Sequence, residues 1–349
     1  YLTQQYRVFP QLANAYAAGC TSRKLMVHQQ ELKEALEKKD QAAPLLAELH
    51  ATSTALKVLV GEVICKGIED CRLACGGHGY SLLSGLPQLY VDAAPVLTAE
   101  GENWILTQQT ARSMLKYLQV VAGGKQLPNF SYAKYLEAEV PRLDSKCRAA
   151  SDADWRNPDI QLEAYGHRAT RIAASVAQQM QDMMASGKSA NDAWNAVLID
   201  TARLARAHAY YILVFNFVQA TSQAEKNQPK LYPYLKRLCD LFALFHIESL
   251  MGDFTEDSYL SASQAGAVRR VIKQLLAEIR PDAVLLVDSF AESDYTLNSD
   301  IGRYDGNVYQ ALWDRAQREP LNKSQVAEGY HKYQQPLIKS GLAKLKAKL

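Results

Sequence analysis

The sequence has almost no excess of charge of either sign, because 39 lysines and arginines are matched by 37 aspartates and glutamates. A protein that holds nucleic acid or an anionic membrane surface by charge carries a field of one sign. No apolar run approaches the roughly 20 residues that a helix needs to cross a bilayer. No basic stretch followed by an apolar one opens the chain. We therefore expect neither a nucleic-acid partner nor a membrane span.

Cysteine is scarce as well. The six residues are Cys20, Cys65, Cys71, Cys75, Cys147 and Cys239. So few thiols do not make a disulfide scaffold, and several lie inside helical patterns, which favours a reducing compartment. Cys71 and Cys75 share a helix face close to His78, but this spacing matches no standard zinc site and no second pair of ligands follows. We therefore predict no metal site.

The sequence also lacks the alternation of apolar and polar residues that is typical of strands. Apolar residues instead return with the period of a helix. Between residues 45 and 74 this period includes Leu56, Leu59 and Val63, which predicts a helix with one buried face. Further helices are predicted within residues 101–122, 162–183, 194–215, 235–242, 268–279 and 282–290. The fold class is predicted to be all-α, a helical bundle followed by a second helical domain.

Glycines indicate where the chain divides. Gly123 and Gly124 follow the second predicted helix and mark a connector. A chain of 349 residues is also longer than one core requires. We therefore expect two helical domains, residues 1–122 and residues 123–349. Residues 81–95 contain turn residues without a regular period, and they are predicted to form a surface loop.

Three glycines follow the first predicted helix: Gly76, Gly77 and Gly79. Glycine has no Cβ and adopts positive φ readily, so the backbone N–H groups at these positions can approach a ligand closely. A simple helix stop uses the same residues, and taken alone the glycines favour that interpretation.

Glu100 precedes Gly101 at the expected start of the second predicted helix. The free N–H groups and the dipole of a helix start stabilise negative charge that develops on a bound molecule. An acidic residue at such a position more commonly caps the helix. The residues alone leave both interpretations open.

Taken together, these stretches resemble two signature motifs of the acyl-CoA oxidase family, within the wider acyl-CoA dehydrogenase superfamily. The motifs are residues 75–80 (CGGHGY) and 100–103 (EGEN). The resemblance reaches both ends of the chain through residues 3–7 (TQQYR), 302–309 (GRYDGNVY) and 320–323 (PLNK). It covers essentially the whole sequence and implies the carboxyl-terminal, helical part of such an enzyme.

The resemblance implies an FAD-dependent enzyme that desaturates a fatty acyl-CoA between its α- and β-carbons. The reduced flavin then passes its electrons to molecular oxygen and releases hydrogen peroxide, in the first step of peroxisomal β-oxidation. A thioester α-proton is weakly acidic. The base that removes it therefore needs a raised pKa, and the enolate oxygen needs a hydrogen-bond donor.

The same resemblance implies roles for individual residues. Glu100 is the expected base, and its own N–H is expected to bind the thioester carbonyl. The remaining expected contacts are with the substrate, through Gly101 and Arg112, and with FAD, through Gln4, Gly76, Gly77, Gly79 and Glu102. The three glycines are expected to meet the FAD of the other subunit of a homodimer. A plain surface position explains Arg112 equally well.

Two residues depart from the family pattern. Ala99 stands where tyrosine is usual, which alters the packing beside the expected base. Trp104 is bulkier than the residue expected after Asn103, and it is expected to narrow the acyl pocket.

The family's amino-terminal helical domain and middle β-domain are not in this sequence. Because those domains supply much of the flavin and acyl-chain site, we expect the chain to work with that amino-terminal part and to be inactive without it. Tyr1 is followed at once by helix-compatible sequence, so we expect the chain to begin inside a longer polypeptide.

The last three residues, 347–349 (AKL), are a variant of the Ser-Lys-Leu address that the peroxisomal import receptor reads. The predicted location is the peroxisome. Two alternatives remain open: a non-catalytic helical subunit or scaffold, and an acyl-CoA dehydrogenase that passes electrons to another flavoprotein. The long helical region after Gly124 and the last three residues favour the oxidase.

Overall fold

The computed structural model describes residues 1–38 and 42–347. Every regular element in these ranges is a helix, which confirms the predicted all-α fold class. The first helices are α1 (Leu2–Lys38), α2 (Ala42–Ala74), α3 (Gly77–Tyr80), α4 (Leu86–Ala93), α5 (Asn103–Ala122), α6 (Tyr135–Glu139), α7 (Pro158–Ala185) and α8 (Ala190–Ala196). They are followed by α9 (Leu198–Asn227), α10 (Tyr232–Ser249), α11 (Met251–Thr255), α12 (Ala262–Ile279), α13 (Ala283–Asp288), α14 (Asp294–Leu297), α15 (Val308–Arg318) and α16 (Gln335–Lys346). Short 3-10 helices lie at Leu82–Ser84, Ala94–Leu97, Tyr132–Lys134, Val140–Arg142, Ala153–Arg156, Arg280–Asp282 and Pro320–Lys323, and a π-helical turn lies at Tyr330–Gln334.

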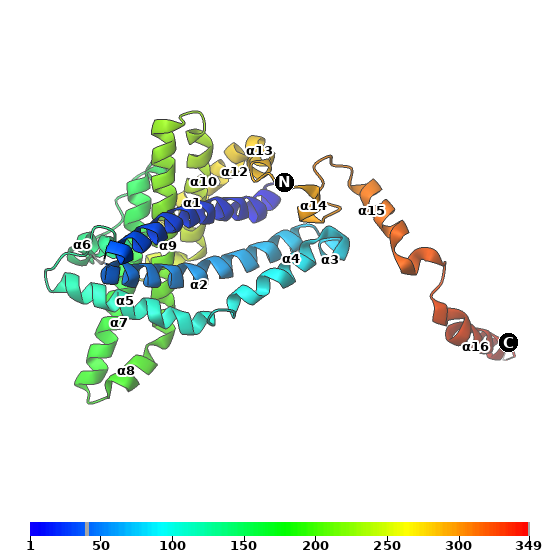
Figure 1. Cartoon of the computed structure of the whole chain (residues 1–349), viewed down its shortest axis with the longest axis horizontal. Coiled ribbons are helices and arrows are strands. Elements are labelled where there is room, and N and C mark those ends of the chain that lie inside the picture. The colour runs from blue at the N-terminus through cyan, green and yellow to red at the C-terminus, as the bar shows by residue number, and fades with distance from the viewer. Residues whose placement is uncertain (39–41, 348–349) are drawn as a thin grey trace. The chain divides into compact units, whose positions relative to one another are not determined.

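The chain forms two compact units, whose helices can be followed in Figure 1. The larger unit contains residues 1–75 and 89–291. The smaller unit contains residues 76–88 and the described residues from 292 onward. Helices from both sides of residue 122 pack against one another in the larger unit, and the domain boundary expected there stays a prediction.

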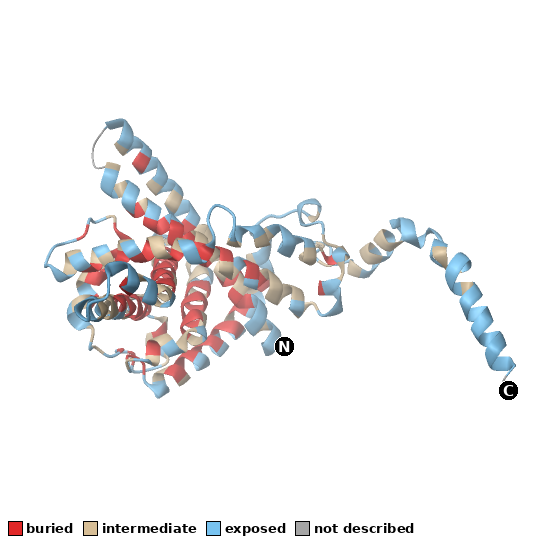
Figure 2. Cartoon of the chain, turned by 90° about the horizontal axis from the view of Figure 1, so that it is seen from below, coloured by how far each residue is buried: buried red, intermediate tan, exposed pale blue. Residues whose placement is uncertain are grey.

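The smaller unit buries few side chains. Helices α15 and α16 contain no buried residue, and Figure 2 shows only intermediate and exposed residues along the segment that leads to the C-terminus. A hydrogen bond from the Asp300 N–H to the Leu83 carbonyl, 2.9 Å long, joins the two segments of this unit. They also approach closely at Gly85. Its φ is +74°, and a Cβ there would lie 3.0 Å from the Asn298 carbonyl oxygen, so only glycine fits.

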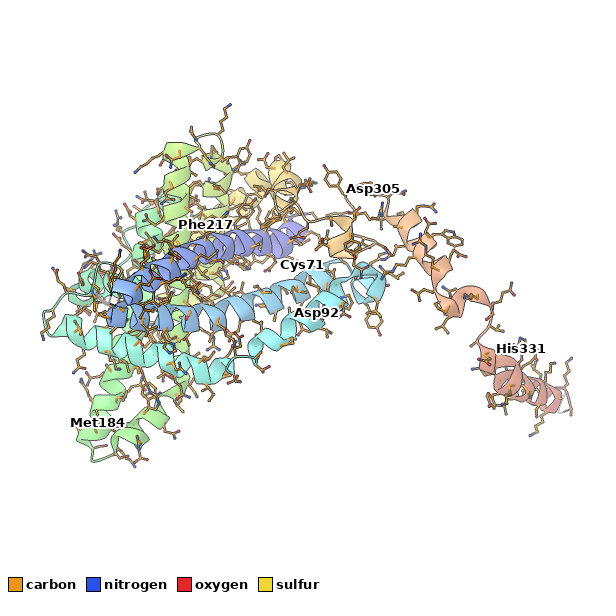
Figure 3. All side chains as sticks on the ribbon, in the orientation of Figure 1. Cys71, Asp92, Met184, Phe217, Asp305 and His331 are labelled. Atoms are coloured by element: carbon orange, nitrogen blue, oxygen red, sulfur yellow. The ribbon has the colours of Figure 1, made fainter. Side chains whose placement is uncertain are left out.

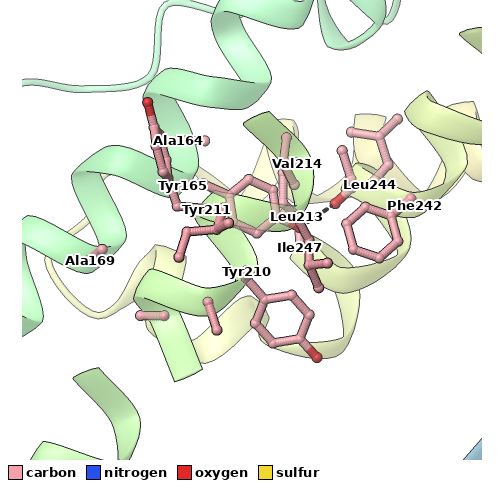
Figure 4. Close-up of a cluster of buried hydrophobic side chains, with 14 of the residues drawn as sticks. Ala164, Tyr165, Ala169, Tyr210, Tyr211, Leu213, Val214, Phe242, Leu244 and Ile247 are labelled. Carbon is pink, nitrogen blue, oxygen red and sulfur yellow. Dashed lines mark hydrogen bonds between the residues drawn. The ribbon is translucent and has the colours of Figure 1, made fainter. Parts of the chain in front are cut away.

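The larger unit is built around α9. Residues 207–214 of this helix are all buried, so no face of it is left to solvent, as expected for a helix that is apolar on every side. Helices α1, α2, α5, α7 and α10 pack against it. Phe217 of α9, labelled in Figure 3, is fully buried. Figure 4 shows Tyr165 of α7, Tyr210 of α9 and Phe242 of α10 gathered in this core.

The helix predictions are confirmed where the apolar period is long. The helix expected over residues 45–74 is α2, and the one expected within residues 101–122 is α5. No described helix is both long and apolar enough to cross a membrane. The loop expected over residues 81–95 is wrong, because most of that stretch is helical. Its prolines, Pro87 and Pro95, lie in first helical turns, where a missing N–H costs nothing.

Glu48 of α2 is a buried carboxylate, 4% exposed, that joins three segments of the larger unit. It accepts hydrogen bonds from the Tyr117 hydroxyl (2.8 Å), the Ser131 hydroxyl (2.9 Å) and the Tyr132 N–H (2.8 Å). Tyr117 belongs to α5, and the other two residues begin the 3-10 helix that follows the connector. Glu48 therefore fastens α2 to α5 and to the chain beyond it.

Two histidines are buried as neutral side chains in the same core. His208 Nδ1 of α9 lies 3.1 Å from the Tyr135 hydroxyl, and His246 Nε2 of α10 lies 2.8 Å from Asn14 Oδ1. Burial lowers the pKa of each histidine to about 3. In the unfolded chain a histidine takes up its proton near pH 6.5. Below that pH the unfolded state therefore binds more protons, so stability present above about pH 6.5 is lost as the pH falls toward 3.

Replacement of Glu48 by glutamine should lower the free energy of unfolding by about 2–3 kcal/mol. The NH2 group of glutamine cannot accept the hydrogen bonds that the Tyr117 and Ser131 hydroxyls donate to one oxygen of Glu48, so buried donors lose their acceptor. Chemical denaturation measures this change. Glu37→Gln, on the exposed surface of α1, is the control and should stay within about 0.5 kcal/mol of wild type. Equal stabilities of the two variants would contradict the role given to Glu48.

The free energy of unfolding should also fall below about pH 6.5, by up to about 1.4 kcal/mol per pH unit for each buried histidine. Denaturation at several pH values between about 7 and 5 gives this slope. A variant with both His208→Gln and His246→Gln should show a shallower slope, whereas the exposed control His331→Gln should keep the wild-type slope. An unchanged slope in the double variant would rule out these two histidines as its source.

Candidate active site

Glu100 lies in a short turn between two helical elements. The 3-10 helix Ala94–Leu97 precedes this turn, and α5 begins after it at Asn103. Glu100 has a φ of +56° and Gly101 a φ of +111°. Two consecutive residues with positive φ therefore set the direction in which the chain enters α5.

Only glycine fits at position 101. A Cβ on Gly101 would lie 2.8 Å from Leu106 Cδ2, and a φ of +111° disfavours any side chain. Glu100 does carry a side chain, so its left-handed conformation costs about 1–2 kcal/mol. Such strain persists only where surrounding contacts determine the conformation, and it is concentrated at functional sites.

The cap of α5 is Glu102. Its carboxylate accepts a hydrogen bond from the Ile105 N–H at 3.2 Å. The capping role considered for Glu100 is therefore filled by a different carboxylate, and the Glu100 side chain is exposed just outside the helix. Among the hydrogen bonds of the described chain, none uses the N–H of Glu100. The turn thus offers an acceptor and a donor side by side.

Lys57 of α2 reaches the same turn. Its ammonium group donates to the Gly101 carbonyl at 2.6 Å and to Asn103 Oδ1 at 2.8 Å. Lys57 lies 44 residues before Gly101, and no motif in the sequence indicates the contact. Only the packing of α2 beside α5 brings the two positions together.

The glycine stretch belongs to the smaller unit. Gly76 has a φ of +59°, and its carbonyl accepts the Gly79 N–H at 3.0 Å. Gly76 and Gly77 are exposed, and a Cβ on either would meet no atom within 4 Å. The backbone at these two positions is therefore open to a ligand, whereas Gly79 is buried. Because α2 ends at Ala74, the helix-stop interpretation holds as well.

Gln4 of α1 lies at the end of α2. Its side-chain Nε2 donates to the Ala74 carbonyl at 3.0 Å, and Arg7 Nη1 donates to Gln4 Oε1 at 3.2 Å. Gln4 therefore fastens the start of α1 to the last residue of α2, which lies two residues before Gly76 in sequence.

Arg112 lies on the exposed side of α5. Its guanidinium carbon is 4.8 Å from the centre of the Trp194 ring, which belongs to α8. A cation over an aromatic face is a favourable contact by itself. This contact is enough to explain an arginine at this surface position. A contact between Arg112 and a substrate stays a prediction.

The structure does not favour a zinc site at Cys71, Cys75 and His78. Burial raises the pKa of the Cys71 thiol to about 11, so the thiol stays protonated at neutral pH and is a poor nucleophile and metal ligand. Figure 3 shows Cys71 near the end of α2. Over the residues that the structure describes, no group of three or more His, Cys, Asp or Glu side chains is placed to hold a metal ion.

Two protein-family models match the chain. The acyl-CoA oxidase C-alpha1 domain matches residues 1–115, and the acyl-CoA oxidase model matches residues 157–339. The first of these ranges contains the Glu100 turn, and the second contains α9.

Curated proteins of the same family are similar over nearly the whole chain. Rat peroxisomal acyl-coenzyme A oxidase 2 is 40% identical over 339 residues, which cover 97% of this chain and 49% of that protein. Peroxisomal acyl-coenzyme A oxidase 1 of Phascolarctos cinereus is 40% identical over 347 residues, which cover 96% of this chain and 50% of that protein. The chain thus spans about half the length of the curated relatives it matches. Their names confirm the predicted peroxisomal location.

Solved structures of the family share the fold. Arabidopsis thaliana acyl-CoA oxidase 1 has a TM-score of 0.90 and 34% identity, and the match covers 98% of this chain and 51% of that one. Acyl-CoA oxidase-1 of Caenorhabditis elegans, solved in complex with FAD and ATP, has a TM-score of 0.88 and 30% identity, covering 97% of this chain and 50% of that one. The chain therefore belongs to the acyl-CoA oxidase family and corresponds to the carboxyl-terminal, helical part of its members.

Proposed function

We propose that this chain carries the catalytic base of an FAD-dependent acyl-CoA oxidase and that Glu100 is that base. The observation that carries the proposal is the Glu100 turn: a carboxylate held outside α5 by two positive-φ residues, within the range that the family model matches. Residues 1–122 form the proposed flavin- and substrate-contacting domain, and residues 123–349 the supporting domain. The gap between the two family-model matches, from 115 to 157, supports a division in this region.

In the proposed reaction, the Glu100 carboxylate takes a proton from the α-carbon of a fatty acyl-CoA. The electron pair of that C–H bond forms the α,β double bond while a hydride leaves the β-carbon, and the product is a trans-2-enoyl-CoA. When bound, FAD supplies the acceptor for this hydride and a route for the electron pair to molecular oxygen, which is reduced to hydrogen peroxide.

The thioester oxygen gains negative charge as the α-proton leaves, and a hydrogen bond to that oxygen lowers the barrier. The Glu100 N–H is the proposed donor, because it has no other hydrogen bond in the described chain. Gly101 has no side chain to hinder the thioester. Arg112 is proposed to face the CoA part of the substrate from a later turn of α5.

Glu100 is exposed in this chain, whereas a base for a weakly acidic C–H group works best when it is shielded from water. The matching relatives are about twice as long as this chain. We propose that the amino-terminal part of such a protein covers the carboxylate and completes the acyl-chain site. On this proposal, the chain alone does not turn over substrate.

FAD is proposed to contact two separate sets of residues, the glycine stretch on the one hand and Gln4 with Glu102 on the other. The open backbone of Gly76 and Gly77 fits a ligand that approaches closely, and Gln4 is fastened to the last residue of α2. Glu102 is proposed to face the flavin through the carboxylate lone pairs that its capping bond leaves free. A relative solved with FAD supports the cofactor. A homodimer in which Gly76, Gly77 and Gly79 meet the partner's FAD completes the proposal.

The import receptor of the peroxisome is a further proposed partner. It would read the last three residues, of which Lys348 and Leu349 lie outside the described part of the chain. The peroxisomal names of the relatives support this proposal.

Glu100→Gln should lower peroxide release from palmitoyl-CoA by roughly 10²–10⁴-fold, because the amide cannot accept the α-proton. The rate is measured at equal flavin occupancy in the enzyme formed by this chain with the family's amino-terminal part. Glu34→Gln, on the exposed surface of α1, should keep the wild-type rate.

Equal rates in wild type and Glu100→Gln would remove Glu100 from the mechanism. Flavin reduction by substrate without peroxide release would identify a dehydrogenase. A wild-type protein with neither activity would identify a non-catalytic helical subunit.

A further inference from the structure

The Glu100 turn contains a strained residue, Glu100, next to a conformationally flexible one, Gly101. Glu100 is held at positive φ, which a residue with a side chain avoids. Gly101 has a φ of +111°, which strains any residue with a Cβ, and a Cβ there would also displace the Leu106 side chain. Glycine, however, reaches many backbone conformations, so it does not by itself hold Glu100 in one position. The conformation therefore has to be determined by contacts from outside the turn.

Lys57 makes such a contact. Its ammonium group donates to the carbonyl of Gly101 at 2.6 Å. This hydrogen bond fixes the plane of the peptide bond between Gly101 and Glu102. The bond is charge-assisted and therefore stronger than one between neutral groups. Lys57 is half-buried and belongs to a 33-residue helix, so the donor is itself held in place.

Asn103, the first residue of α5, binds the same ammonium group. It is 4% exposed, and its Oδ1 accepts from Lys57 at 2.8 Å. Its Nδ2 lies 3.4 Å from the Val58 carbonyl and 3.4 Å from Glu62 Oε1. An ammonium group only donates, so these partners allow a single orientation of the Asn103 amide. Lys57 therefore holds the turn at two points, one before the cap of α5 and one after it.

Glu62 is held in turn from the core helix. Arg206 of α9 donates to both of its carboxylate oxygens, with Nη2 at 2.7 Å from Oε1 and Nε at 2.8 Å from Oε2. The Arg206 guanidinium carbon also lies 5.1 Å from the centre of the Trp104 ring. Trp104, which departs from the family pattern, therefore packs on a side chain that supports the turn. A bidentate pair of this kind resists rotation of both partners.

We infer that Lys57 is a positioning residue for Glu100: its ammonium group selects the one conformation of the Glu100–Gly101 turn in which the carboxylate is presented outside α5. The inference rests on the proposed function, in which Glu100 is the base. Lys57 itself touches neither substrate nor cofactor in this role. It acts by holding the Gly101 carbonyl and Asn103, and thereby the backbone on which the base is carried.

Hydrogen exchange tests the structural part of the inference on this chain as it is. In Lys57→Met, the peptide that covers residues 99–105 should exchange roughly tenfold faster than in wild type, because the turn opens locally. Peptides from α2 and α9 should exchange at wild-type rates. Lys66→Met, an exposed lysine of the same helix, is the control and should leave residues 99–105 unchanged. Unchanged exchange of residues 99–105 in Lys57→Met overturns the inference, and so does faster exchange spread over α2 and α9.

Flavin reduction under anaerobic conditions tests the catalytic part, in the FAD-loaded enzyme that contains the family's amino-terminal part. Lys57→Met should lower the rate constant of flavin reduction by roughly 10–100-fold, since a small misplacement of a reacting group has an effect of this size. The Kd for the acyl-CoA should stay within about twofold of wild type, because Lys57 does not contact the substrate. Lys57→Arg, which keeps the charge and the donors, should recover part of the rate, and Lys66→Met should keep all of it.

The Glu100→Gln variant separates the two ways in which the account can fail. If Glu100→Gln is inactive while Lys57→Met reduces flavin at the wild-type rate, Glu100 is the base and the role of Lys57 is wrong. If Glu100→Gln also keeps the wild-type rate, the proposed function itself is wrong. A rise in the Kd with no change in the rate constant assigns Lys57 to substrate binding and overturns the positioning role.

Discussion

Burial of α9 on every side is the constraint from which the arrangement of the larger unit follows. Residues 207–214 leave no face of this part of the helix to solvent, so other helices must cover it on every side. Helices α1, α2, α5, α7 and α10 do so, and each of them contributes buried residues to the same core. Two polar side chains buried with them, Glu48 and His246, are paired across helices, which helps to fix the positions of these helices.

The Glu100 turn is connected to this core by a short series of polar contacts. Arg206 extends from α9 to Glu62 of α2, Glu62 meets Asn103 at the start of α5, and Lys57 binds both Asn103 and the turn. A residue at the surface is thereby held by a helix at the centre. The arrangement explains how an exposed carboxylate on a strained backbone keeps a defined position.

The sequence predicted features that depend on local patterns. Long apolar periods predicted α2 and α5, and two short motifs indicated the family and the candidate base. It missed the helical turns within residues 81–95, because proline and glycine, which suggest a loop, are also tolerated in first helical turns and caps. It gave no indication of Lys57, since a contact between residues 44 apart in sequence has no local signature. The choice of Glu102 as the cap depends on two backbone angles that only the structure supplies.

The central claim, that Glu100 removes the α-proton, is tested most directly by hydrogen exchange on a substrate analogue. An acyl-CoA whose β-carbon carries no hydrogen cannot be desaturated, but a base in the site still exchanges its α-hydrogens with deuterated water. NMR follows this exchange in the enzyme formed by this chain with the family's amino-terminal part. We expect wild type to catalyse the exchange and Glu100→Gln to lose it at equal flavin occupancy. Exchange at the wild-type rate in Glu100→Gln would show that another group takes the proton.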